Sequence, residues 1–368
     1  MDLAAFDELI AYEVADKTIP SISYILFDYN EVLARRHVAR DGVLPADAMF
    51  RIGSISKTFA AIGALQLVEQ GRLDLDADVA TIIDGFTPVN PWGNEAPTLR
   101  KLLSHRSGLT REAGSGGYLD PQGVALADTV AGLGRSQLKA PADGSQYFYS
   151  NAGFAVVGRA IERATGRSYG QHLHDALVAP LGLTDIAIAL TPTIRARLAS
   201  AGMWTVEGDA DAPLFDLGSA PAGKIYATLD DVARWGQMLL RGGESLVSAE
   251  ALALAWTPAG TDPAKGYGLG FAVDTLDGHR TIGHGGAVYG YASGFTLLPE
   301  AGIGIAMVST LDFTNELVGR LTRRALRIVL AERGLGRWPR PARQLPPAGV
   351  ALALDAAGRY VAPDGVEL

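Results

Sequence analysis

The alternation of apolar and polar residues divides the chain into a β-rich start, a helical middle and a β-rich end. Residues 3–15 carry apolar side chains at helical spacing, which predicts an amphipathic helix that Pro20 ends. Residues 21–27 and 32–40 are rich in β-forming residues, and the polar segment 28–31 between them predicts a hairpin turn. The chain is therefore expected to begin with a helix and a two-stranded hairpin.

Helical patterns dominate the middle of the chain up to about residue 245. Residues 54–70 form a strong one, and Gly71 follows where a helix C-cap is expected. Thr228 and Asp231 have the spacing of a capping box, which predicts that a helix begins there. The shorter helical patterns cover residues 98–103, 124–133, 152–165, 169–178 and 229–240.

Two long segments of this middle part lack periodicity. Residues 111–123 are rich in Gly, and residues 205–223 are acidic and rich in Ala, Pro and Gly. Long segments of this kind are typical of functional lids or of mobile surface loops, and we favour lids.

The last third of the chain returns to strand patterns. A helix is predicted at residues 315–332, after strands at residues 269–275, 280–283, 291–298 and 303–309. Strands at both ends of the chain predict an α+β fold, with a mostly antiparallel sheet covered by terminal helices and an inserted helical subdomain. The expected division is residues 1–50 with 225–335 as the sheet domain, 51–224 as the helical subdomain, and 336–368 as a Pro-rich linker and C-terminal extension.

Composition narrows the class of protein. The chain has 368 residues, 48% of them apolar and 20% charged, which is ordinary for a globular protein with a sizeable core. Lys and Arg number 32 against 40 Asp and Glu, and a net charge of −8 argues against nucleic acid or an anionic membrane as the main partner. The lack of cysteine excludes a thiol nucleophile, a disulfide framework and Cys-based metal sites.

The start of the chain does not have the pattern of a secretory leader. Acidic residues are mixed into residues 1–17, whereas a leader needs a positive start and an apolar core. No stretch reaches the roughly 18 apolar residues of a membrane span. We therefore expect a soluble cytoplasmic protein, with a leader trimmed ahead of Met1 as the alternative. The motifs that bind a nucleotide, a dinucleotide or zinc are missing as well, so neither a cofactor nor a metal is expected.

The first candidate site is Ser54-Ile55-Ser56-Lys57. Residues three apart on a helix share a face, so the hydroxyl of Ser54 and the amine of Lys57 can meet. The start of a helix favours a developing negative charge, and apolar neighbours lower the pKa of a lysine toward the range of a general base. The spacing alone is weak, because Ser136 and Lys139 match it too, and an N-cap serine followed by a solvated lysine is the alternative.

Two further candidates lie far along the chain. Tyr149 and Asn151 precede the helical pattern at 152–165; a tyrosine can relay a proton, and an amide can hold a lysine or a substrate carbonyl. A core tyrosine beside an N-cap asparagine is the alternative. His284, Gly285 and Gly286 follow a predicted strand; the glycines let a substrate pair with the strand edge, and the histidine could bond to the tyrosine or polarise the substrate. A glycine-rich turn with an exposed histidine is the alternative.

Taken together, these elements resemble the penicillin-recognising serine hydrolases, and most closely the branch of class C β-lactamases, D-aminopeptidases, DD-carboxypeptidase-like proteins and β-lactamase-fold esterases. Ser54–Lys57 matches the S-x-x-K motif of that family, Tyr149–Asn151 its Y-x-N motif, and His284–Gly286 its third motif, K-T-G or H-x-G. The resemblance extends over roughly residues 6–330, with support from the stretches at residues 102–109, 180–185, 221–223 and 267–270.

The resemblance implies the β-lactamase/DD-peptidase-like fold and a set of roles. Ser54 would be the nucleophile that forms an acyl-enzyme, Lys57 its base, and Tyr149 the group that relays the proton to the leaving group. Asn151 would position Lys57 and the substrate, and the backbone N–H groups of Ser54 and Ala287 would form the oxyanion hole. Gly285 and Gly286 would line the substrate strand next to them.

His284 departs from the lysine that many members of this family carry. A fixed cation there helps to hold the carboxylate of penicillin-like or D-Ala-D-Ala substrates, whereas histidine is mostly neutral near pH 7. An esterase, or an amidase acting on small D-residue peptides, is therefore the first hypothesis. A β-lactamase or DD-carboxypeptidase is the second, and a non-catalytic penicillin-binding or interaction protein with this fold is the third. In each case the expected partner is a small ester, amide or peptide.

Overall fold

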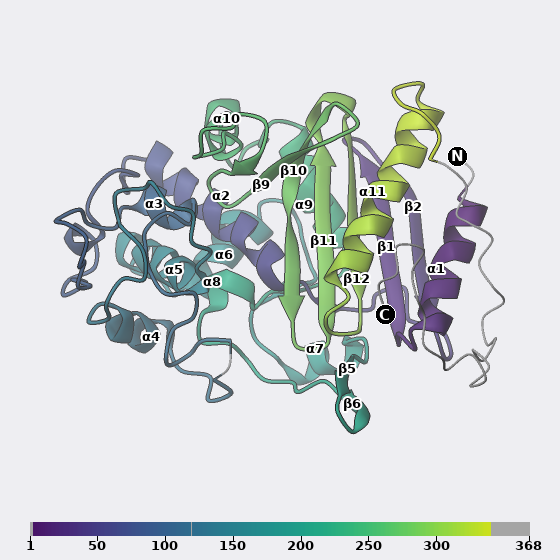
Figure 1. Ribbon diagram of the computed structural model, residues 1–368, viewed down its shortest axis with the longest axis horizontal. Helices are drawn as coiled ribbons and strands as arrows, with labels where there is room; N and C mark the ends of the chain where they lie inside the picture. The colour runs from purple at the N-terminus through teal and green to yellow at the C-terminus, as the bar shows by residue number, and fades with distance from the viewer. Residues whose placement is uncertain (1–2, 119, 340–368) are drawn as a thin grey trace, which may run out of the picture.

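A seven-stranded antiparallel sheet forms one side of the molecule (Figure 1). The structure is a computed structural model, and it describes residues 3–118 and 120–339. The strands follow the order β2-β1-β12-β11-β10-β9-β8, so the first hairpin of the chain pairs with its last strand. Their bounds are β1 Ser21–Asp28, β2 Val32–Ala39, β8 Gly266–Tyr267, β9 Ala272–Leu276, β10 His279–Val288, β11 Tyr291–Leu298 and β12 Ile303–Ser309.

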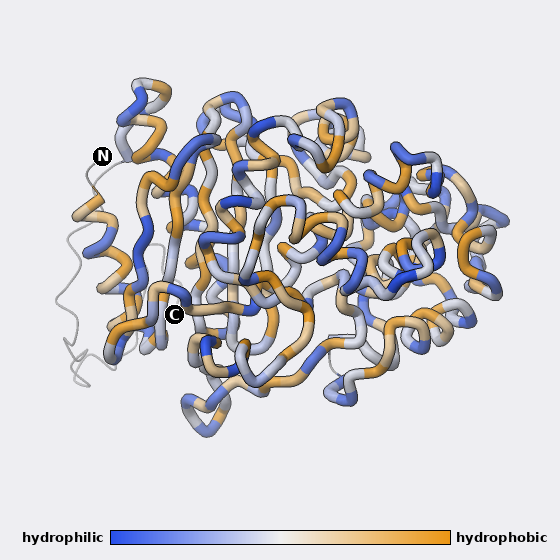
Figure 2. Tube along the Cα trace, turned by 180° about the vertical axis from the view of Figure 1, so that it is seen from behind, coloured by the Kyte–Doolittle hydropathy of each residue, from blue (hydrophilic) through white to orange (hydrophobic). Residues whose placement is uncertain are grey.

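Both faces of the central strands are covered, and β1 is accordingly buried from Ser21 to Phe27. Side chains alternate between the two faces of a strand. Tyr24 and Leu26 point into a core with the terminal helices α1 (Ala4–Asp16) and α11 (Asn315–Glu332), whereas Ile25 and Phe27 join the core that contains α9 (Leu229–Leu240). Figure 2 shows the resulting apolar stretches running along the sheet, with polar stretches in the outer loops.

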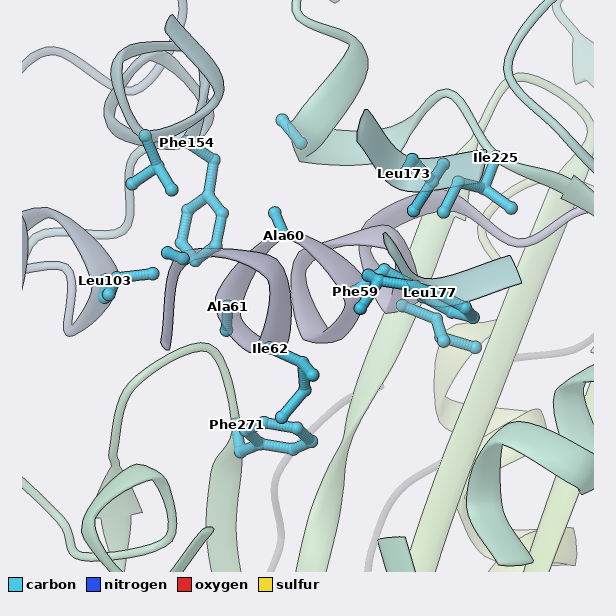
Figure 3. Packing of buried hydrophobic residues seen from close by; sticks show 14 of the residues in the cluster. Phe59, Ala60, Ala61, Ile62, Leu103, Phe154, Leu173, Leu177, Ile225 and Phe271 are labelled. Atoms are coloured by element: carbon cyan, nitrogen blue, oxygen red, sulfur yellow. The ribbon is translucent and has the colours of Figure 1, made fainter. Parts of the chain in front are cut away.

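The helical region lies beside the sheet on the side of β10 and is built around α2 (Ser56–Glu69). The side chains of α2 are buried from Ser56 to Leu67, as expected for a helix that other elements surround on all sides. In Figure 3, α2 lies between Phe154 and Leu103 on one side and Phe271 on the other. Phe59 of α2 stacks on Trp235 of α9 with ring centroids 3.9 Å apart, which ties the helical region to the sheet.

Shorter elements complete the helical region. The helices are α3 Leu99–Leu103, α4 Leu126–Leu133, α5 Asn151–Thr165, α6 Tyr169–Leu173, α7 Pro192–Arg197, α8 Ala220–Gly223 and α10 Ala249–Ala255, with 3-10 turns η1 Gly53–Ile55 and η2 Val79–Thr81 and a π-helical turn His174–Val178. Another 3-10 turn, Pro299–Ala301, lies between β11 and β12 of the sheet. The small sheets are β3 Phe50–Arg51, β7 Tyr226–Ala227 and β4 Ile186–Ala187, and the hairpin of β5 Gly202–Thr205 with β6 Gly208–Asp211.

Most predicted elements are confirmed, including the α+β architecture with terminal helices on the sheet. The capping prediction is half right: the Thr228 hydroxyl accepts a hydrogen bond from Asp231 N at 3.3 Å, whereas the Asp231 carboxylate accepts one from Asp185 N. Two short helices, α7 and α10, were missed because they carry too few turns to show a helical period.

Three predicted boundaries were wrong in ways that affect the chemistry. Ser54 lies in the turn η1, two residues before Ser56, the first residue of the helix that was predicted to contain it. The strand predicted at residues 280–283 continues to Val288, so the third motif lies within β10 rather than after it. Part of the segment 205–223, predicted as a loop, forms a hairpin and α8.

Two further predictions stay predictions, because the structure does not test them. The division into a sheet domain and a helical subdomain stays a prediction, and most of the predicted C-terminal extension, residues 340–368, lies outside the described residues. No helix within residues 3–118 and 120–339 has the length and apolar character that crossing a membrane requires.

The close approach of β10 to η1 yields a stability prediction. A Cβ atom at Gly286 would lie 2.2 Å from Ile52 O and 2.1 Å from Ser293 Oγ, so Gly286→Ala must push the strand away from the turn. We expect a loss of about 1–3 kcal/mol in the free energy of unfolding, measured by thermal or urea denaturation. Gly285→Ala is the matched control, because its nearest contact is Ser293 O at 3.8 Å, and it should unfold like the wild type. Equal stability of the two variants would contradict the packing described here.

Candidate active site

Ser54 is placed at the point where the helical region touches the sheet. The turn η1 carries Gly53 at φ +53°, and a Cβ there would lie 2.8 Å from Ala287 N, so the turn packs directly on β10. Glycine is needed at this position both for the left-handed backbone and for the close approach. The Ser54 side chain is half-buried, which leaves its hydroxyl open to a reagent.

Lys57 reaches back from the first turn of α2 to this hydroxyl. Its Nζ lies 3.0 Å from Ser54 Oγ, 2.7 Å from Asn151 Oδ1 and 2.6 Å from Ala222 O. The three oxygens come from η1, from the start of α5 and from α8. Three segments that are distant in the sequence therefore surround one amine.

The surroundings of Lys57 fix both its charge and the direction of its hydrogen bonds. Burial holds the pKa of Lys57 well below its ordinary value, Glu112 opposes this shift, and Arg111 adds to it. A neutral amine has two N–H groups and one lone pair. Asn151 Oδ1 and Ala222 O can only accept, so they take the two N–H groups, and the lone pair faces Ser54 Oγ. When the amine is neutral, the Ser54 hydroxyl donates to Lys57, an arrangement that suits a nucleophile beside a base.

Asn151 is oriented by a carboxylate that the sequence analysis missed. Its Nδ2 donates to Glu112 Oε1 at 2.5 Å, so its Oδ1 must face Lys57. Glu112 Oε2 also accepts from Tyr118 N at 3.2 Å. Glu112 lies in the segment 111–123, where the lack of periodicity gave no signal that could have singled it out.

Tyr149 contacts Ser54 from the other side. Its hydroxyl donates to Ser54 Oγ at 2.9 Å, and burial raises the pKa of Tyr149 well above its ordinary value, so the phenol keeps its proton at rest. The Tyr149 ring packs 4.2 Å from the ring of His105, whose Nδ1 accepts from Ser150 N at 3.1 Å. The Arg111 guanidinium lies 5.1 Å above the same ring.

His284 does not contact Tyr149 by a hydrogen bond, contrary to one expectation. Its Nε2 lies 2.8 Å from the hydroxyl of Tyr267, its Nδ1 contacts Gly285 O, and its ring centroid is 6.3 Å from that of Tyr149. The alternative of an exposed histidine in a turn is also wrong, because His284 is buried within β10. The reason is that β10 pairs with β9 only up to Gly283, so His284 turns toward the residues around β8.

The rest of the third motif lies beside Ser54. Gly285 and Ala287 are exposed, whereas Gly286 is buried against Ile52, and Gly286 O accepts from Asn315 Nδ2 at 2.7 Å. A small pocket includes three of the candidate residues, Ser54, Asn151 and Ala287. Its other lining residues are Glu112, Tyr118, Leu217, Ser219, Ala222 and Gly223.

Three aromatic rings lie at the edge of this pocket. Tyr118 stacks on Tyr289 with centroids 4.5 Å apart, and Phe215 lies 5.2 Å from Tyr289. Tyr118 and Phe215 come from the two segments that were predicted as lids, and Tyr289 follows β10. A larger cavity, lined by Pro20, Leu44 and Met203 among others, contains none of the candidate residues.

The described residues offer no metal-binding cluster: no three His, Asp or Glu side chains within 3–118 and 120–339 gather in a way that could hold an ion. The side chains that the structure brings together are a hydroxyl, an amine, a phenol and an amide. Their chemistry is that of acyl transfer by a nucleophile and proton relay.

Comparison with known protein families shows to which family the chain belongs. A model of the beta-lactamase family matches residues 6–330. The chain belongs to the beta-lactamase family. Among curated relatives, penicillin-binding protein 4 of Amycolatopsis lactamdurans is 30% identical over 302 residues, which are 75% of this chain and 77% of that protein. The human putative beta-lactamase-like 1 is 27% identical over 83% of this chain and 64% of its own length, so the chain spans less than two thirds of that relative.

Solved structures of this family share the fold. A D-stereospecific amidohydrolase from Streptomyces superposes with a TM-score of 0.72 at 26% identity, covering 90% of this chain and 98% of that chain. The octameric penicillin-binding protein homologue from Pyrococcus abyssi superposes with a TM-score of 0.78 at 24% identity, covering 90% and 78%. The expected β-lactamase-like fold is therefore confirmed.

The lone pair of Lys57 makes the reactivity of Ser54 depend on pH. We expect a fluorophosphonate to label Ser54 faster as the pH rises, with a midpoint well below 10.5, because Lys57 accepts the hydroxyl proton only when it is deprotonated. The measurement is the labelling rate by mass spectrometry. Lys57→Ala should slow it about 10²- to 10⁴-fold. Lys101→Ala is the control, since that amine bonds to Ala96 O away from the site. Labelling of Lys57→Ala at the wild-type rate would remove Lys57 from this role.

Proposed function

We propose that this protein is a serine hydrolase that cleaves small amides and esters through an acyl-enzyme on Ser54. The observation that carries the proposal is the position of Ser54 Oγ, 3.0 Å from the amine of Lys57 and 2.9 Å from the hydroxyl of Tyr149, with the pKa of the amine lowered and that of the phenol raised by burial. Membership of the beta-lactamase family supports it.

In the first half of the reaction, Lys57 takes the proton of Ser54 as Oγ attacks the substrate carbonyl. The negative charge on the carbonyl oxygen is met by the backbone N–H groups of Ser54 and Ala287, which the contact between η1 and β10 holds close together. Donors fixed in advance in this way are worth about 10²- to 10³-fold in rate each.

In the second half, Tyr149 donates its proton to the leaving group and is reprotonated by Lys57. The leaving amine or alcohol departs, and water then enters its place. Tyr149 and Lys57 remove a proton from that water as it attacks the acyl-enzyme, and Ser54 recovers its proton when the acid product leaves. The two steps use the same groups in opposite directions, as general acid–base catalysis requires.

The pocket walls favour a substrate with a free amine and an aromatic or bulky apolar side chain. Glu112 is the carboxylate beside Ser54 in the pocket, and two hydrogen bonds leave it further capacity to accept. An ammonium group on the acyl part would meet this charge, while the rings of Tyr118, Phe215 and Tyr289 would pack on its side chain. The Streptomyces neighbour is a D-stereospecific amidohydrolase, and we therefore rank D-amino acid amides first.

A substrate panel tests the proposal directly. We expect turnover of D-phenylalanine amide and of p-nitrophenyl butyrate, and none by Ser54→Ala, since Ser54 is the hydroxyl that the amine of Lys57 and the phenol of Tyr149 contact. Lys57→Ala and Tyr149→Phe should each lose about 10²- to 10⁴-fold in kcat/KM with unchanged thermal unfolding.

Other results of this substrate panel would support one of the two alternative hypotheses, a β-lactamase or DD-carboxypeptidase, or a non-catalytic binding protein. Turnover of penicillins or D-Ala-D-Ala peptides alone would indicate the β-lactamase or DD-carboxypeptidase class. A stable covalent adduct of penicillin on Ser54 without turnover of any substrate would indicate a non-catalytic binding protein.

Glu112→Gln separates the recognition of the amine from the chemistry. The glutamine keeps an oxygen for Asn151 but removes the charge, so kcat/KM for D-phenylalanine amide should fall about 10- to 100-fold more than that for p-nitrophenyl butyrate. Asp120→Asn is the control, because this carboxylate of the same loop accepts from Gly116 N outside the pocket. Equal losses on both substrates with Glu112→Gln would show that Glu112 acts on the catalytic groups, through Asn151 and Lys57, and does not recognise the amine of the substrate.

A further inference from the structure

Both ring nitrogens of His284 already have partners inside the protein. Nδ1 contacts Gly285 O, and Nε2 lies 2.8 Å from the hydroxyl of Tyr267. A carbonyl oxygen can only accept, so Nδ1 must carry a proton. If the ring is neutral, Nε2 has only a lone pair, and the Tyr267 hydroxyl must donate to it. The two contacts together allow one tautomer of the neutral ring.

We propose that Tyr267 is a positioning residue that holds His284 as a neutral ring with its proton on Nδ1, so that the third motif offers substrates no cation. Sequence reasoning had placed Tyr267 only among the stretches that support the family resemblance. The structure gives it a specific partner and a direction for the hydrogen bond.

Tyr267 is held firmly enough to do this. It lies in the short edge strand β8, where it pairs with Ala272 of β9, and its side chain is buried. Its ring lies 4.5 Å from that of His105 and meets the His284 ring edge-on at 5.6 Å. Burial raises the pKa of Tyr267 well above its ordinary value, so its hydroxyl remains a donor throughout the working range of pH.

The surroundings of His284 favour the neutral ring. Burial and, when the amine is protonated, the charge of Lys57 together lower the pKa of His284 to about 3, against the opposing effect of the contact with Gly285 O. Tyr267 faces the ring from β8 and Tyr149 from the segment before α5, and both are phenols that keep their protons. His105, which packs between these two tyrosines, is held neutral by its own burial, and the charge of Lys57 adds to that shift.

Removing the Tyr267 hydroxyl would change this balance in a known direction. A hydrogen bond donated to Nε2 stabilises the neutral ring, so its loss raises the pKa of His284, while the contact of Nδ1 with Gly285 O still keeps the proton of the neutral ring on Nδ1. A substrate carboxylate beside β10 would then meet a ring that can become positive at mildly acidic pH. This last consequence rests on the proposed hydrolase function, whereas the state of the ring does not.

The state of the ring can be measured without any substrate. In ¹⁵N-histidine-labelled wild-type protein, we expect His284 to show a protonated Nδ1 and an unprotonated Nε2, unchanged between about pH 5 and 8. Tyr267→Phe should keep the proton of the neutral ring on Nδ1 but raise the pKa of the ring, so that Nε2 begins to take up a proton toward pH 5. Tyr147→Phe is the matched control: its ring lies 6.0 Å from that of Tyr267 in the same cluster, but it is not one of the two partners of His284. A wild-type ring that titrates in this range, or identical spectra for the two variants, would overturn the proposal.

A kinetic comparison reads out the consequence for specificity. D-phenylalanylglycine and its amide differ only in the terminal carboxylate. Tyr267→Phe should raise the ratio of their kcat/KM values at pH 5 relative to pH 8 by about 3- to 10-fold, and Tyr147→Phe should leave it unchanged. If the NMR result holds and neither peptide is cleaved, the proposed function fails and the assignment of Tyr267 stands. A ratio that does not respond in Tyr267→Phe, with both peptides cleaved, would overturn the link to specificity.

Discussion

The cost of burying a charged amine is the constraint on which the site depends. A lysine ammonium removed from water without a counter-charge is strongly unfavourable, so Lys57 gives up its proton instead. Once neutral, the amine has two protons to donate and one lone pair to offer. The oxygens of Asn151 and Ala222 take the protons, which leaves the lone pair for Ser54. In the proposed mechanism, Lys57 can therefore act as a base because of where the fold places its amine.

The neighbours of Lys57 keep that basicity within useful limits. Glu112 orients the amide of Asn151, and its negative charge raises the pKa of the amine, while Arg111 acts in the other direction. Burial alone would make Lys57 too weak a base to accept the Ser54 proton, because the ammonium formed in the reaction would be unsupported. A carboxylate separated from the amine by one amide supports that ammonium without pairing with it directly. The loop that carries Glu112 is thus part of the proposed chemistry, in addition to forming a wall of the pocket.

Sequence patterns predicted the parts of this arrangement that follow from short-range periodicity. Ser54 and Lys57 meet because they are three residues apart across the start of a helix, and the apolar period around them was visible. The meeting of Lys57 with Asn151 came from the family resemblance, since no local pattern fixes contacts across 94 positions. Glu112 gave no signal at all, because an irregular loop places its side chains by long-range contacts.

The glycines misled the prediction of β10. They have low strand propensity, so the pattern suggested an end at residue 283, yet Gly286 is required where the strand passes Ile52 without room for a side chain. The contact of His284 with Tyr267 was equally hidden, because it depends on where β9 stops pairing with β10. Which residues of two strands lie opposite each other is settled only when the whole sheet assembles, so a local sequence pattern does not predict it.

A neutral His284 also has an electrostatic consequence for the first motif. The charges of Lys57 and His284 act on each other, and the positive amine lowers the pKa of the ring. During the proposed reaction Lys57 becomes positive when it accepts the Ser54 proton. A second fixed cation on β10 would repel that charge in a region of low dielectric constant and would weaken the base further. In the proposed arrangement, Tyr267 holds the ring neutral, so His284 does not repel the transient ammonium of Lys57. The negative charge of Glu112 then stabilises that ammonium. The histidine in the third motif and Glu112 beside Asn151 thus both support the proposed function, in which the site holds one positive charge at a time and recognises substrates through their amine rather than their carboxylate.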